Sequence, residues 1–104
     1  MEKIQQGDVL INRITDLPSG VVKIDKKTRG YVLAEGETTG HAHVVNSDDV
    51  EMYERNGVLY LSVMEAATLV HEEHSSIVLE PGTYEIGIVQ EVDPFTEQIR
   101  KVID

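Results

Sequence analysis

Short apolar segments alternate with clusters of turn-forming residues along almost the whole chain. The apolar segments are rich in Val, Ile, Leu and Tyr, and Gly, Pro, Asn or Asp stand between them. Segments of this composition and punctuation are typical of the strands of a sandwich or barrel. The expected strands are residues 8–14, 21–24, 31–34, 41–45, 50–54, 58–63, 67–71, 77–79 and 84–90. The pattern predicts an all-β fold, a small barrel or sandwich of short, mostly antiparallel strands.

Residues 84–90 and 58–69 carry further local signals for strands. In residues 84–90, Tyr84, Ile86 and Ile88 share one face of a strand, which predicts that this strand is half-buried. Residues 58–69 have a composition that also suits a helix at their Ala-containing end. The preceding Asn56-Gly57 favours strands, because Asn-Gly between apolar segments is the strongest short hairpin signal.

The carboxyl-terminal segment allows two interpretations. Asp93-Pro94 suits the start of a short helix, in which Phe95, Ile99 and Val102 would form an apolar stripe. Alternatively, residues 99–103 form a terminal strand with alternate residues on each face. Since 104 residues suit one compact domain and no repeat or linker is visible, we expect a single β domain over residues 1–104.

Composition narrows the classes of function. The net charge is -10, from 19 acidic and 9 basic residues, and this balance argues against nucleic acid, whose affinity comes from Lys and Arg. The short basic cluster at residues 23–29 is interpreted as a solvated turn. The first residues lack the pattern of a signal peptide, and no segment approaches a membrane span of about 20 apolar residues. We therefore expect a cytoplasmic protein without a membrane or nucleic-acid partner.

All four histidines fall in two tight pairs. The first pair is His41 and His43, directly after Gly40. Residues two apart in a strand point to the same face, so these two imidazoles would project together. Because the chain contains no Cys, any bound metal must be held by nitrogen and oxygen. This pair is therefore a candidate pair of metal ligands, and the alternative is two polar residues on a solvent-facing strand.

The second pair is His71 and His74, in the sequence His71-Glu72-Glu73-His74. We expect His71 at the end of a strand and His74 in the turn after it. Glu72 or Glu73 would supply a carboxylate ligand, an acceptor that orients an imidazole, or a general base, and Glu73 is the candidate catalytic residue. The spacing differs from that of the zinc-protease His-Glu-x-x-His helix. The alternative is an acidic, hydrated loop.

The two pairs are expected to form one site, because the segment between them is long enough to bring them together in a small β domain. The predicted ligands are His41, His43, His71 and His74. Three or four imidazoles with one carboxylate suit a divalent transition metal, and Zn, Ni, Fe and Mn all remain candidates.

Residues 36–43, Gly-Glu-Thr-Thr-Gly-His-Ala-His, resemble the first motif of the cupin family, in which His-x-His follows a glycine. Asp48 or Glu51 stands where that motif has a glutamate. The resemblance implies a small β-barrel in which His41 and His43 are metal ligands.

The second cupin motif is represented by Pro81-Gly82, which no histidine follows. The Gly-His-x-His and His-x-Glu-His patterns are also similar to those of small uncharacterised proteins of bacteria and their phages, which imply no activity.

The sequence predicts a metal-binding small β-barrel domain whose biochemical role it does not specify. One alternative is a cupin-like, metal-dependent small-molecule enzyme, with a small-molecule ligand at an open metal position. The other is a structural or assembling protein without metal, in which a histidine cluster among carboxylates titrates near neutral pH. Small β domains often cover edge strands by association, so a homo-oligomer is expected.

Overall fold

The computed structural model describes residues 3–35, 40–88, 90–92 and 99–101, and these residues contain β-strands and no helix. The described part of the chain accordingly has no helix that could cross a membrane. The strands are β1 (Lys3–Gln6), β2 (Val9–Ile14), β3 (Val22–Ile24), β4 (Tyr31–Glu35), β5 (Ala42–Val45), β6 (Val50–Arg55), β7 (Val58–Val63), β8 (Ala67–Val70), β9 (Ile77–Leu79), β10 (Gly82–Ile88), β11 (Gln90–Val92) and β12 (Ile99–Lys101).

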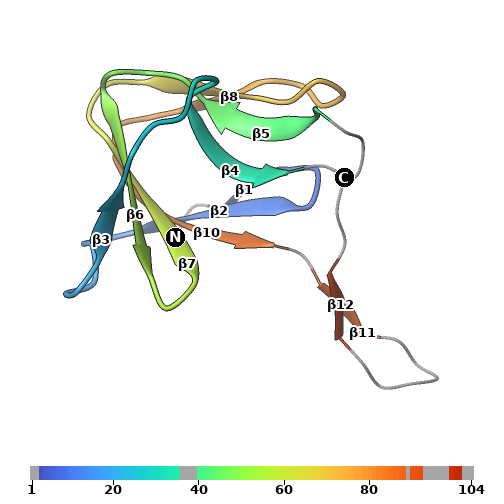
Figure 1. Ribbon diagram of the computed structural model, residues 1–104, viewed down its shortest axis with the longest axis horizontal. Helices are drawn as coiled ribbons and strands as arrows, with labels where there is room; N and C mark the ends of the chain where they lie inside the picture. The colour runs from blue at the N-terminus through green and yellow to red at the C-terminus, as the bar shows by residue number, and fades with distance from the viewer. Residues whose placement is uncertain (1–2, 36–39, 89, 93–98, 102–104) are drawn as a thin grey trace.

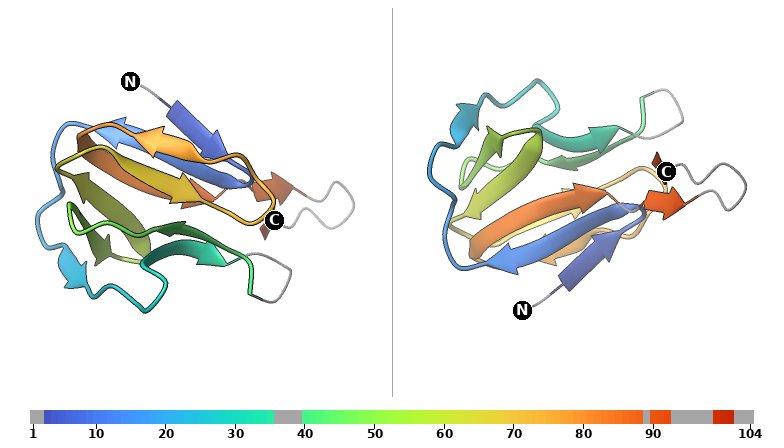
Figure 2. Two further views of the ribbon diagram at one scale, coloured as in Figure 1. Left: turned by 90° about the horizontal axis from the view of Figure 1, so that it is seen from above. Right: turned by 90° about the horizontal axis from the view of Figure 1, so that it is seen from below.

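Two antiparallel sheets form the main body (Figure 1). The larger sheet has the strand order β1-β2-β10-β7-β6-β3, and the smaller has the order β4-β5-β8-β9. In the view of Figure 1, β4, β5 and β8 of the smaller sheet lie above β1, β2 and β10 of the larger, and Figure 2 shows the same strands from above and below. No strand pairing joins the two sheets within the described residues, so the barrel is not closed. Strands β11 and β12 form a separate hairpin that projects from the main body (Figure 1).

The hydrophobic core lies between the inner faces of the two sheets. The larger sheet contributes Ile11, Leu61 and Tyr84, and the smaller contributes Val45 and Leu69, all at most 1% exposed. Alternation explains which residues face inward, because every second side chain of a strand points to the same face. In β10, Tyr84 and Ile86 are buried while Glu85 is only half-buried, which confirms the half-buried strand predicted there.

The predicted strands from residue 8 to residue 88 are confirmed as strands, with shifts of one or two residues at their ends. Residues 58–69 form β7 and the start of β8. The Asn56-Gly57 dipeptide forms the two-residue turn between β6 and β7, with φ of 52° at Asn56 and 80° at Gly57. These values suit the tight hairpin turn that Asn-Gly favours.

The sequence pattern did not reveal the first strand. Strand β1 has the sequence Lys-Ile-Gln-Gln, whose single apolar residue gives no alternating pattern. At the other end, Ile99–Lys101 is a strand, so of the two interpretations left open for this segment the strand is confirmed for these residues and the helix is wrong. Asp93, Pro94 and Phe95, on which that helix would begin, lie outside the described residues, and so do residues 36–39 of the cupin-like segment.

Gly30 stands directly before β4 and lies close to the backbone at the end of β5. Its φ is 122°, and an added Cβ would lie 2.8 Å from the carbonyl oxygen of Val45 and 2.9 Å from Asn46 Cα. We expect Gly30→Ala to lower the free energy of unfolding by about 2 to 3 kcal/mol, because backbone cannot move aside cheaply and this φ is costly for alanine. Chemical denaturation measures the change.

The matched control is Gly87→Ala in β10. There the nearest atom to an added Cβ is Leu10 Cβ at 3.9 Å, which is an ordinary contact. The control should change the free energy of unfolding by less than about 0.5 kcal/mol. Equal stability of both variants would show that the backbone around Gly30 is not constrained.

Candidate metal centre

The antiparallel register of β5 and β8 brings the two histidine pairs together. Val45 pairs with Leu69, and Val44 pairs with Val70. One further step along the same register places His43 opposite His71. The next step places Ala42 opposite Glu72, where the Ala42 amide donates a hydrogen bond of 3.0 Å to Glu72 Oε1. Two segments far apart in the sequence therefore meet because the strands that carry them are paired.

The four imidazole rings form a contiguous group, the histidine row, with His71 at its centre. The ring centroid of His71 lies 4.4 Å from that of His43, 4.6 Å from that of His74 and 5.8 Å from that of His41. His43 is fully buried and His71 is 7% exposed, while His41 and His74 are half-buried. His71 follows the last residue of β8, and His74 lies in the bend after it. This placement confirms the predicted strand end and turn.

Gln6 fixes the tautomer of His43. The side-chain nitrogen of Gln6 donates hydrogen bonds to the carbonyl oxygens of Leu69, at 3.1 Å, and Ser75, at 2.9 Å. Its Oε1 is therefore the atom that lies 2.8 Å from His43 Nδ1, and Nδ1 must donate to it. In neutral His43, the lone pair is then on Nε2, which lies 3.6 Å from Asp8 Oδ1. Gln6 orients this imidazole as carboxylates and carbonyls orient the histidines of metal sites.

His71 has a different environment. Its Nδ1 accepts a hydrogen bond of 3.0 Å from the amide of Glu73, so neutral His71 carries its proton on Nε2. That Nε2 is buried and has no hydrogen-bond partner among the described residues. An unsatisfied buried polar group costs about 1 to 3 kcal/mol, and it is a sign of a ligand, ion or water at that position.

Glu72 ties the beginning of β5 to the end of β8. Its Oε1 accepts the Ala42 hydrogen bond, and its Oε2 lies 2.6 Å from the Arg29 guanidinium. Arg29 also donates a hydrogen bond of 2.8 Å to the carbonyl oxygen of Gly40, directly before His41. A carboxylate has about four lone-pair positions. Glu72 therefore keeps the capacity to bind a metal ion while it holds these partners.

Three residues have donor atoms close enough together to share one metal ion. One side-chain nitrogen or oxygen from each of His41, His71 and Glu72 lies within 4.8 Å of the other two. Donor atoms bound at about 2.1 Å to one tetrahedral zinc ion lie about 3.4 Å apart. The donors would thus have to draw together by at most about 1.4 Å, a movement that side-chain rotation can supply. The two histidine pairs each contribute one member to this group.

Glu73 contacts the other end of the row. Its Oε1 lies 3.5 Å from His41 Nδ1, and its side chain is 65% exposed. Glu73 lies in the bend after β8, three residues beyond Val70, the last residue of β8 that pairs with β5. The position suits a carboxylate that orients an imidazole.

The metal-free protein should show an unusually acidic Glu72. The hydrogen bond from the Ala42 amide, the amide of Glu72 itself and the Arg29 guanidinium lower its pKa from 4.5 to about 2. The stability that ionised Glu72 contributes is therefore fully present above its unfolded pKa of 4.5 and is lost as the pH falls towards about 2. We expect the difference in free energy of unfolding between the native chain and Glu72→Gln to shrink over this range.

Carbon-13 NMR of the side-chain carboxyl groups, in the presence of a chelator, measures this pKa directly. Arg29→Ala is the control, because it removes a lesser cause of the shift and leaves the Ala42 amide in place. A Glu72 carboxyl that titrates near 4.5 in the native chain would show that these hydrogen bonds do not form.

Sequence reasoning missed three residues of this site. Gln6 and Asp8 come from the β1–β2 hairpin, and Arg29 comes from the segment before β4. Gln6 and Asp8 are 3% and 5% exposed, and burial of two polar residues is not visible in a sequence. The sequence predicts that the basic cluster containing Arg29 is a solvated turn, whereas the ion pair of Arg29 with Glu72 shows that this member belongs to the site.

Comparisons with known proteins place the chain in a family without assigning it a function. Neither the search of curated proteins nor the search of solved structures finds a match. A family model described as "Domain of unknown function (DUF8820)" matches residues 5–89. This range contains Gln6, Asp8 and the whole histidine row, and it ends before the β11–β12 hairpin. The chain therefore belongs to the DUF8820 family.

Proposed function

We propose that this protein is a metal-binding β domain that holds one divalent transition metal ion at the histidine row. The observation that carries the proposal is the environment of His71, whose buried Nε2 has no hydrogen-bond partner among the described residues and which belongs to the donor group with His41 and Glu72. A metal ion on this nitrogen would replace an unsatisfied buried group with a coordinate bond.

Metal binding at His71 Nε2 requires a change of tautomer. The proton must then be on Nδ1, which cannot at the same time accept the hydrogen bond from the Glu73 amide. We therefore expect the Glu73 amide to leave this position when the ion binds. The amide NMR signal of Glu73 is a direct reporter of that step.

A second proposal is a metal-dependent small-molecule enzyme, and one observation favours it. A cavity of about 260 Å³ is lined by His71 and Glu72 together with Arg29, Ala42, Val44 and Val70. Two imidazoles and one carboxylate leave a fourth position of a tetrahedral ion open to water or substrate. In this proposal Glu73 is the predicted base, although its 65% exposure suits the orientation of His41 better than proton transfer in a dry site.

Metal analysis of the purified protein tests the proposal. We expect elemental analysis to find close to one equivalent of Zn, Ni, Fe or Mn. After treatment with a chelator, titration with zinc, nickel and manganese chlorides in a calorimeter should show saturable binding. At a free ion concentration of 100 times Kd, the free energy of unfolding should rise by about 2.7 kcal/mol. A protein that is isolated without metal and gains no stability from any of these ions would overturn the proposal.

A further inference from the structure

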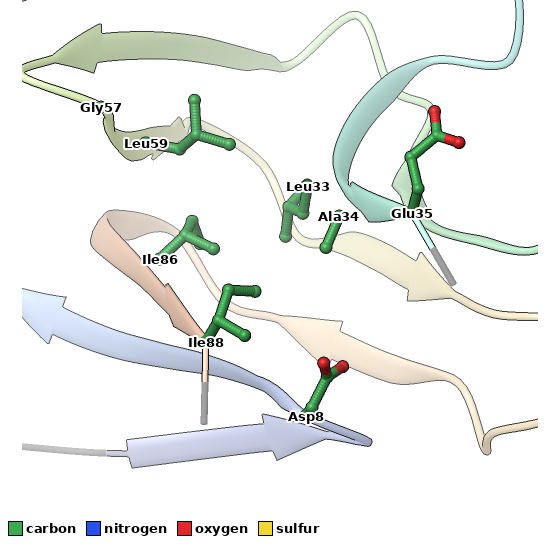
Figure 3. A pocket seen from close by; sticks show the side chains of 8 residues that line it. All are labelled: Asp8, Leu33, Ala34, Glu35, Gly57, Leu59, Ile86 and Ile88. Carbon is green, nitrogen blue, oxygen red and sulfur yellow. The ribbon is translucent and has the colours of Figure 1, made fainter. Parts of the chain in front are cut away.

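A second cavity lies between the two sheets and is distinct from the one beside His71. It measures about 350 Å³, near the lower limit for small-molecule sites. Strands from both sheets and two hairpin turns form its walls, as the close view shows (Figure 3). Among the described residues, its lining consists of Asp8, Leu33, Ala34, Glu35, Gly57, Leu59, Ile86 and Ile88.

The lining combines aliphatic walls with one inward-facing acid. Leu33, Leu59, Ile86 and Ile88 present only hydrocarbon, and the Asp8 carboxylate points towards the same space (Figure 3). Glu35 stands at the margin with its carboxylate directed away from these side chains (Figure 3). A compact apolar cavity with one convergent polar group is the usual composition of a small-ligand site.

The charge of the cavity selects the ligand. The Asp8 side chain is 4% exposed, and the described lining contains carboxylates but no Lys or Arg. A ligand carboxylate or phosphate would be repelled, whereas an ammonium group would form a charge-assisted hydrogen bond in a site of low dielectric. The chain as a whole carries a net charge of -10, which also attracts cations.

We propose that this cavity binds a small aliphatic amine, with the ammonium group on the Asp8 carboxylate and the alkyl chain against Leu59, Ile86 and Ile88. The volume limits the ligand to a short chain. Asp8 Oδ1 also lies 3.6 Å from His43 Nε2, so the carboxylate stands between the amine site and the histidine row. The amine site nevertheless uses none of the proposed metal ligands, and it does not require a bound metal.

Hexylamine, hexanol and hexanoate separate the contributions of charge and apolar contact. Each is titrated into the full-length protein in the presence of a chelator, and binding is followed by NMR of the backbone amides of Gly57, Leu59 and Ile86. We expect hexylamine to bind with a Kd on the order of 1 mM and at least about tenfold more tightly than hexanoate. The proposal would be overturned if hexanoate bound as tightly as hexylamine. It would also be overturned if no probe shifted these amide signals at a concentration about 20-fold above the expected Kd.

Two variants locate the site. Asp8→Asn keeps the shape of the side chain and removes its charge, so the preference for hexylamine over hexanol should disappear. Leu59→Phe adds volume at the wall and should weaken hexylamine and hexanol alike, and it leaves Asp8 and the histidine row unchanged. Circular dichroism checks that each variant is folded. An unchanged hexylamine affinity in both folded variants would place the bound amine elsewhere and overturn the proposal.

Discussion

Replacing His71 with alanine is expected to weaken zinc binding by more than about 100-fold. Residues that only support metal ligands already contribute 10- to 100-fold in affinity, and His71 is itself one of three proposed ligands. Its ring also contacts the rings of the other three histidines, so its loss removes the centre of the row. Calorimetric titration of the chelator-treated variant with zinc measures the effect.

His41→Ala and Glu72→Gln should weaken zinc binding to a similar extent, whereas His74→Ala should cost less than about tenfold. His74 packs against His71 with ring centroids 4.6 Å apart, but the donor group with mutual distances below 4.8 Å comprises His41, His71 and Glu72. A loss with His74→Ala as large as with His71→Ala would instead favour the four-histidine site predicted from the sequence. Native zinc affinity in a folded His71→Ala variant would exclude the metal centre.

The sequence predicts the main strands because their signals are local. Alternation in β10 and the Asn56-Gly57 turn depend on neighbouring residues only, and both correspond to the structure. Strand β1 lacks such a local signal. Its last residue, Gln6, is buried because its side chain contacts residues more than sixty positions away in the sequence. Tertiary contacts of this kind decide secondary structure where the local pattern is weak.

The candidate site could be predicted as a set of histidines but not as a geometry. Spacing shows that His41 and His43 share a strand face, whereas the β5–β8 register decides that His43 lies opposite His71. A shift of one residue in that register would turn one pair to the other face of the sheet. Four expectations from the sequence stay predictions. They are the identity of the metal ligands, the relation to cupins, the homo-oligomeric state and the cytoplasmic location.

Replacing Gln6 with alanine is expected to lower the free energy of unfolding of the metal-free protein by about 3 to 5 kcal/mol. The change leaves the Leu69 and Ser75 carbonyls without these donors and removes the acceptor of the fully buried His43 Nδ1–H. Each buried group that loses its partner costs about 1 to 3 kcal/mol. Gln6 also connects β1 of the larger sheet to β8 of the smaller, so the effect extends to the packing of the two sheets. Urea denaturation in the presence of a chelator measures it.

Gln5→Ala is the matched control in the same strand. Gln5 is exposed and its side chain bonds only locally, to the Gly7 carbonyl at 2.7 Å, so this variant should lose less than about 0.5 kcal/mol. The double variant Gln6→Leu/His43→Leu tests the origin of the effect, because replacing both partners with apolar groups removes an unsatisfied pair instead of creating one. It should be more stable than the sum of the two single changes implies. Additive losses would show that Gln6 acts through packing and does not hold His43 in its tautomer.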